Sequence, residues 1–182
     1  MSAKTRFPYI EAVSVAGLLL QRLADSCERI VIAGSVRRQK SNVGDIELLC
    51  IPKPTDNVFY ADALDEAVKG LIGATPPLLA YRPNVKGSVI YGPLNKLLID
   101  CPSGIALDLF STSAQNWGMA LLVRTGSAEF NIRVMSRFKA LGMQGHADGG
   151  VTAQDGTEIP CPTEEVVFEL LRWPFIPPEE RK

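Results

Sequence analysis

The stretch GSVRRQKSNVGDIELL, residues 34–49, combines a Gly-Ser turn, two arginines and two carboxylates spaced one residue apart. The β-branched run before it, RIVIA (29–33), predicts a strand, and IELLCI (46–51) predicts a second strand. Side chains at positions i and i+2 of a strand project from the same face, so Asp45 and Glu47 are expected side by side. The stretch therefore predicts a turn between two strands at which charged groups gather.

The Gly34-Ser35 turn has the composition of an anion cradle. Backbone N–H groups at such a turn can point at an anion, and the Ser35 hydroxyl and Arg38 guanidinium can add donors to it. Gly44 allows close approach of the backbone on the other side. The turn therefore predicts a phosphate-binding site.

The pair Asp45 and Glu47 needs a cation between its two like charges if both carboxylates are to stay ionised. Hard oxygen ligands suit Mg²⁺ or Mn²⁺. Taken alone, the pair fits a solvated strand edge better than a metal site.

A third carboxylate, Asp108, lies within the apolar strand IALDLF (105–110). An exposed edge position would explain it, but burial without a cation or donors would be costly. Three acids on adjacent strands beside an anion cradle predict a two-metal phosphoryl-transfer site, in which the ions lie about 3.5–4 Å apart.

The composition is that of an ordinary globular protein of one domain or two small ones, with 182 residues, of which 46% are hydrophobic. No apolar run is long enough to span a bilayer and the N-terminus does not resemble a signal peptide, so we expect a cytoplasmic protein without a membrane partner. The net charge of −1 argues against a protein that coats nucleic acid by bulk electrostatics. The acidic C-terminal residues, Glu164 among them, predict a solvated face.

The remaining pattern predicts a mixed α/β unit followed, after a boundary near residue 112, by a smaller unit of helices and one hairpin. Expected helices span residues 9–25, 60–71, 115–123, 128–141 and 163–171. Further strands are expected at residues 85–91, 96–100 and 105–110, and a glycine-rich hairpin at 143–159.

Several of these motifs together resemble family X DNA polymerases, within the nucleotidyltransferase superfamily. GSVRR (34–38) followed by GDIE (44–47) resembles the family's GSxRR…GDxD signature, and LDL (107–109) matches the strand of its third catalytic aspartate. WGMALLVRTGSAEFN (117–131) resembles the thumb segment, and the ending TEEV…PFIPPEER (163–181) resembles the family's closing segment. The resemblance spans roughly residues 7 to 181.

This resemblance implies an α+β fold: a nucleotidyltransferase palm, residues 1–112, with a mixed sheet flanked by helices, followed by a small α/β thumb domain, residues 113–182. It implies a DNA-directed DNA polymerase that transfers a nucleotide from a dNTP to a primer 3′-hydroxyl, in short-gap filling during DNA repair or replication. The implied cofactors are two Mg²⁺ ions, with Mn²⁺ as the alternative, and the implied partner is primer-template or gapped DNA.

Roles carried over from the family fall into three groups. Catalysis and metal binding would belong to Asp45, Glu47 and Asp108. Nucleotide binding would belong to Gly34, Ser35, Arg38, Gly44, Val123, Arg124, Thr125, Gly126 and Asn131. DNA binding would belong to Lys86, Arg133 and Arg137.

Some positions differ from the family and leave alternatives open. Glu47 stands where the family has aspartate, while Met135 and Ala106 replace basic residues expected near template and primer. A template-independent nucleotidyltransferase acting on RNA or protein is one alternative, and a catalytically weak nucleotide- or DNA-binding module is another. No lyase or fingers segment is recognisable, so we expect a protein partner to supply DNA-binding domains.

Overall fold

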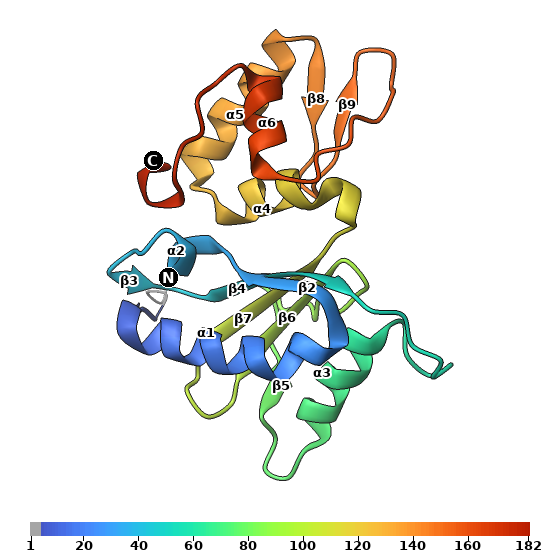
Figure 1. Ribbon diagram of the computed structural model, residues 1–182. Helices are drawn as coiled ribbons and strands as arrows, with labels where there is room; N and C mark the ends of the chain where they lie inside the picture. Colours follow the sequence, from blue (N-terminus) through green and yellow to red (C-terminus); the bar gives the residue numbers. More distant parts are fainter. Residues whose placement is uncertain (1–4) are drawn as a thin grey trace. The chain divides into compact units, whose positions relative to one another are not determined.

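The structure, a computed structural model that describes residues 5–182, divides into two compact units, with the boundary between Ser111 and Thr112 (Figure 1). Each unit encloses a hydrophobic core of its own. A mixed sheet flanked by helices is followed by a small helical unit with a hairpin, which confirms the predicted α+β class.

The first unit is built on a five-stranded sheet in the order β2-β4-β7-β6-β5. Only β4 and β7 pair in parallel, and the other neighbours are antiparallel. A two-stranded pair, β1 with β3, lies outside this sheet. The elements are β1 (Phe7–Pro8), α1 (Tyr9–Leu23), η1 (Ala24–Ser26), β2 (Cys27–Ile32), α2 (Gly34–Arg37), β3 (Asn42–Val43), β4 (Ile46–Pro52), α3 (Ala63–Gly73), β5 (Leu79–Tyr81), β6 (Asn95–Asp100) and β7 (Ala106–Ser111).

Helices α1 and α3 cover one face of this sheet (Figure 1), and the short helix α2 packs against α1 and β4. The core beneath α1 and α3 takes alternate residues of the central strands, among them Leu48 of β4 and Leu107 of β7, both fully buried. Because successive side chains of a strand point to opposite faces, Glu47 and Asp108 project from the face away from this core. The alternation of buried hydrophobic residues along β4 and β7 thus places both carboxylates on the opposite face of the sheet.

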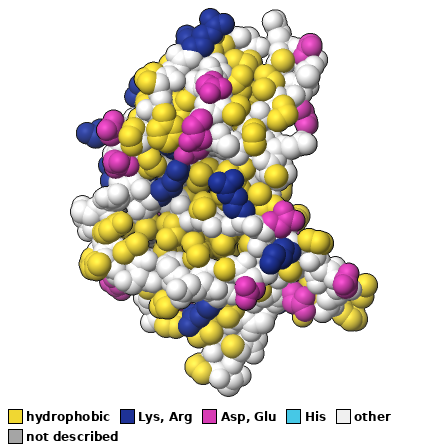
Figure 2. All heavy atoms as spheres, in the orientation of Figure 1, with side chains coloured by type: hydrophobic (Ala, Val, Ile, Leu, Met, Phe, Trp, Pro, Cys, Tyr) yellow, Lys and Arg dark blue, Asp and Glu magenta, His cyan; other side chains and the backbone are white. Residues whose placement is uncertain are grey.

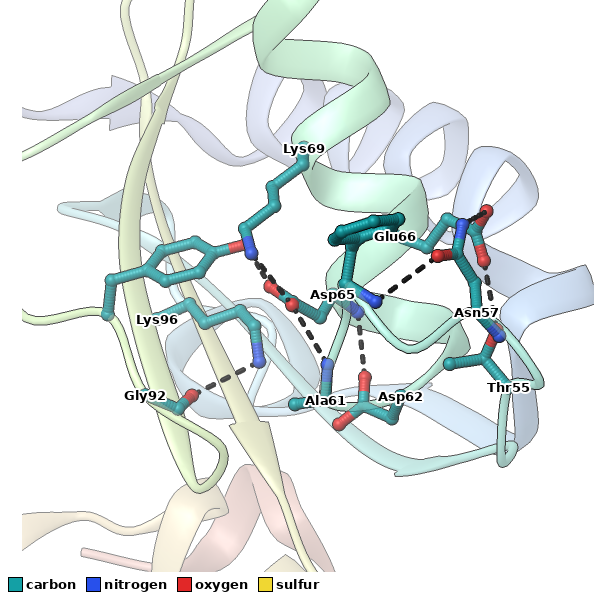
Figure 3. Close-up of polar contacts among 11 residues, drawn as sticks. Thr55, Asn57, Ala61, Asp62, Asp65, Glu66, Lys69, Gly92 and Lys96 are labelled. Atoms are coloured by element: carbon teal, nitrogen blue, oxygen red, sulfur yellow. Dashed lines mark hydrogen bonds and ion pairs between the residues drawn. The ribbon is translucent and has the colours of Figure 1, made fainter.

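A polar network ties helix α3 to the loops around it (Figure 3). The Asp65 carboxylate, 5% exposed, accepts hydrogen bonds from Lys69 Nζ at 3.0 Å, Tyr91 Oη at 2.8 Å and the Ala61 amide at 3.2 Å. Lys96, on β6, donates to the Gly92 carbonyl at 3.1 Å. These contacts hold the segment 91–96 against α3 and so support β6, the neighbour of β7.

Replacing Asp65 with asparagine is expected to flatten the acid limb of the stability profile. Burial raises the pKa of Asp65, but hydrogen bonds from Lys69 and Tyr91 outweigh it and hold the pKa below its usual value. A depressed pKa stabilises the fold above the unfolded pKa of about 3.9, and this contribution is lost as the pH falls below that value. Thermal midpoints by circular dichroism should therefore fall less between about pH 5 and pH 3 in Asp65→Asn than in the wild type. Equal falls in the two proteins would contradict the assignment.

The second unit packs three helices and a hairpin around ten buried residues that include Phe130, Phe138 and Phe168. Helix α4 meets α6 closely at Gly118, where an added Cβ would lie 2.0 Å from the Thr163 carbonyl oxygen. The elements are η2 (Ala114–Asn116), α4 (Trp117–Thr125), α5 (Ala128–Ala140), β8 (Met143–Gly145), β9 (Val151–Ala153), α6 (Glu164–Leu171) and η3 (Pro178–Glu180).

Two expectations from the sequence were wrong. The strand expected at residues 85–91 is absent, and β5 lies at Leu79–Tyr81 instead; residues 83–91 form only isolated bridges around a turn closed by Asn84 and Gly87. Glu164 is buried rather than solvated, because it pairs with the buried Arg181.

Within residues 5–182, no helix is both long and apolar enough to cross a membrane. On the face shown in Figure 2, acidic and basic side chains are interspersed. This mixture agrees with the near-neutral net charge.

Candidate active site

The turn after β2 brings a glycine and a serine close to strand β4. Gly34 has a φ of +61°, and an added Cβ there would lie 1.7 Å from Glu47 Oε2. The Ala33 amide donates to the Glu47 carbonyl at 2.8 Å, which fixes the turn beside the strand. Only glycine fits position 34, both for its backbone angle and for the space that Glu47 leaves.

The Ser35 hydroxyl in this turn makes no hydrogen bond to another described residue. Its Oγ is buried. A buried polar atom without a partner is costly, so a ligand that accepts from Ser35 would relieve this cost. Arg38 lies at the end of α2, where its amide donates to the Gly34 carbonyl at 3.1 Å.

The parallel pairing of β4 with β7 brings two of the three predicted carboxylates to adjacent positions. Glu47 and Asp108 are register partners, and Asp45 lies directly before β4, next to Gly44. All three side chains are partly exposed. Strand pairing therefore places three carboxylates, which are hard oxygen donors, at neighbouring positions beside the Gly34-Ser35 turn.

The Asp108 carboxylate already has a cationic partner, Arg82, which the sequence did not suggest. Arg82 follows β5, and its Nη2 donates to Asp108 Oδ1 in an ion pair. Among residues 5–182, no group of three or more histidine, cysteine, aspartate or glutamate side chains lies close enough together to hold a metal ion. Strand register thus aligns the acids, while their side chains make other contacts.

Four of the predicted nucleotide-binding residues, together with Asn131, meet where α4 ends and α5 begins in the second unit. Val123, Arg124 and Thr125 form the end of α4, and Gly126 caps it with a φ of +70°. Asn131 Nδ2 donates to the Val123 carbonyl at 2.8 Å, while its buried Oδ1 has no partner among the described residues. The second unit thus presents one buried acceptor beside this turn.

The predicted DNA-binding residues differ in their exposure and in their contacts with other residues. Lys86 is exposed in the turn that Asn84 closes. Arg137 donates from Nε to the Leu171 carbonyl at 3.0 Å, and Arg133 lies 5.7 Å from the centre of the Trp173 ring. The two arginines of α5 therefore also have contacts inside their own unit.

Comparison with known proteins agrees with the fold class. The family described as DNA polymerase beta thumb matches residues 120–182. DNA polymerase lambda of Rattus norvegicus is 29% identical over 168 residues. The chain therefore resembles family X DNA polymerases.

The match to polymerase lambda covers 83% of this chain. The chain spans 28% of the length of polymerase lambda. The similarity therefore includes both units of the chain but a minor part of the relative.

Proposed function

We propose that the chain is a DNA-directed DNA polymerase of the family X type, which transfers a nucleotide from a dNTP to a primer 3′-hydroxyl and fills short gaps. The observation that carries this proposal is the register of Glu47 with Asp108, with Asp45 and the Gly34-Ser35 turn alongside. The thumb match and the similarity to a protein named a DNA polymerase support it.

The donor set fits a hard divalent cation in type and in strand position, since it consists of three carboxylates at neighbouring positions. Asp45, Glu47 and Asp108 would hold two Mg²⁺ or Mn²⁺ ions. When bound, these ions would supply stabilisation of the charge that develops on the attacking and leaving oxygens.

The chain's own residues would bind and orient the substrates. Ser35 Oγ and the Arg38 guanidinium would donate to the β- and γ-phosphates, with Gly34 and Gly44 leaving room for them. Asp108, which projects from the face of the sheet opposite α1 and α3, would receive the proton of the primer 3′-hydroxyl. Attack on the α-phosphate in line with the leaving group would then release pyrophosphate.

The second unit would contact the sugar, the base and the DNA backbone. The turn Val123–Gly126 would lie under the sugar, and Asn131 would reach the minor-groove edge of the base. Arg133 and Arg137 of this unit, and Lys86 of the first unit, would meet DNA phosphates. A protein partner that supplies further DNA-binding domains is part of this proposal.

A template-independent nucleotidyltransferase acting on RNA or protein is the second candidate. The contacts of Arg137 with the Leu171 carbonyl and of Arg133 with Trp173 favour it, because these cations are then less available to a template strand.

Extension of a labelled primer separates these candidates. The chain is incubated with each dNTP on one-nucleotide-gapped, recessed and single-stranded DNA, in Mg²⁺ or Mn²⁺. We expect incorporation of the complementary nucleotide, strongest on the gapped substrate. Addition without regard to template, or to single strands alone, would favour the second candidate, and nucleotide binding without addition would indicate a catalytically weak module.

A further inference from the structure

Arg82 is held in place from three directions. Its backbone amide donates to the Leu97 carbonyl at 3.0 Å, its Nε donates to the Leu98 carbonyl at 3.2 Å, and its Nη2 pairs with Asp108 Oδ1. Its side chain is 27% exposed and that of Asp108 is 16% exposed. The amide bond holds the backbone and the Nε bond holds the guanidinium itself, so the side chain cannot swing freely away from the carboxylate.

The position of Arg82 relative to the site follows from the strand order. Leu97 of β6 is the register partner of Asp108 on β7, and Asp108 is the register partner of Glu47 on β4. Arg82 thus reaches across β6 to the third carboxylate of the proposed site. Nothing in its surrounding sequence, YRPN (81–84), distinguishes it from an ordinary surface arginine.

A fixed positive charge on Asp108 opposes the binding of another cation there. It occupies a lone pair of Oδ1 and adds repulsion that, for unit charges about 4 Å apart, is several-fold stronger near a protein surface than in bulk water. It also compensates the like-charge repulsion among the carboxylates when no metal is bound. Both effects weaken metal binding at Asp108.

We propose that Arg82 is a positioning residue that holds the Asp108 carboxylate in place of a cation and competes with the divalent metal for it. This inference rests on the proposed function, because it takes Asp108 as a metal ligand. The arginine sets the concentration of divalent metal that the site requires and leaves the affinity for the nucleotide to other groups. It also explains why strand register aligns the acids although their side chains do not gather as a metal site.

The test measures binding of Mn²⁺ alone to the full chain, by the electron paramagnetic resonance signal of free Mn²⁺, without DNA or nucleotide. Arg82→Met keeps the aliphatic stem and removes the charge, and Arg82→Gln removes the charge but keeps a donor. Arg82→Lys keeps the charge. Arg22→Met, at an exposed position of α1, controls for the loss of one positive charge anywhere in the unit. Circular dichroism checks that each variant is folded.

We expect Arg82→Met and Arg82→Gln to bind Mn²⁺ about tenfold more tightly than the wild type, since one nearby charge is removed. Arg82→Lys and Arg22→Met should bind as the wild type does. In an Asp108→Asn background, Arg82→Met should give no gain.

Wild-type or weaker Mn²⁺ binding by both folded neutral variants would overturn the role of Arg82, as would a gain that persists in Asp108→Asn. If Asp108→Asn leaves Mn²⁺ binding of the wild type unchanged, the carboxylate assignment itself fails, and the proposed function fails with it. The two failures are thereby distinguished.

Discussion

Asp108→Asn is expected to lower single-nucleotide incorporation by at least about 10³-fold, because a metal ligand and proton acceptor is removed while the shape of the side chain is kept. The fold should persist, since Asp108 projects from the face of β7 opposite the core and asparagine can still accept from Arg82. The rate is measured in a single turnover on one-nucleotide-gapped DNA.

Asp56→Asn is the matched control, since it removes an exposed carboxylate in the same unit. It should incorporate nucleotides at the wild-type rate. Incorporation by a folded Asp108→Asn protein within about tenfold of the wild type would contradict the role of this carboxylate, since one factor of ten is 1.4 kcal/mol.

Arg181→Ala is expected to destabilise the second unit by about 3–5 kcal/mol, the range for breaking a buried ion pair from one side. The Arg181 side chain is fully buried, its Nη1 pairs with Glu164 Oε1 at 2.6 Å, and its Nε donates to the Ile176 carbonyl at 2.9 Å. Its guanidinium also lies 5.3–5.7 Å from the ring centres of Phe130, Phe168 and Phe175. The alanine variant leaves the Glu164 carboxylate buried without its cation.

Urea unfolding followed by tryptophan fluorescence measures this effect. Both tryptophans of the chain, Trp117 and Trp173, belong to the second unit, so the signal reports on that unit alone. Lys139→Ala, at an exposed position of α5, should change the free energy of unfolding by less than about 0.5 kcal/mol. A similarly small change in Arg181→Ala would show that the pair contributes little to the fold.

The local parts of the site could be predicted from the sequence because they depend on neighbouring residues. The run 46–51 predicted the strand found at Ile46–Pro52, and 105–110 predicted the strand found at Ala106–Ser111. The glycine at position 34 indicated a turn, and its φ is positive. Here the hydrophobic pattern and the turn residues agree with the tertiary structure.

The non-local parts could not be predicted, because strand pairing and side-chain partners depend on residues far apart in the chain. The register of Glu47 with Asp108 joins positions 61 residues apart. Arg82 and Arg181 carry no local signal, since an isolated arginine is usually an exposed side chain. The run 85–91 contains valine and isoleucine, which favour strands. The segment nevertheless forms a turn and isolated bridges, because strand propensity depends on the tertiary context.

Nucleotidyl transfer to a primer end is tested most directly by measuring the fates of the α- and γ-phosphates of the dNTP. The chain is incubated with gapped DNA and a complementary dNTP labelled either at the α- or at the γ-phosphate. We expect the α-label to enter the primer while the γ-label is released as pyrophosphate in equal amount, and Asp108→Asn to lose both. Release of the γ-label as inorganic phosphate without primer extension, or no transfer by the folded chain under any of the divalent metal conditions, would contradict this expectation.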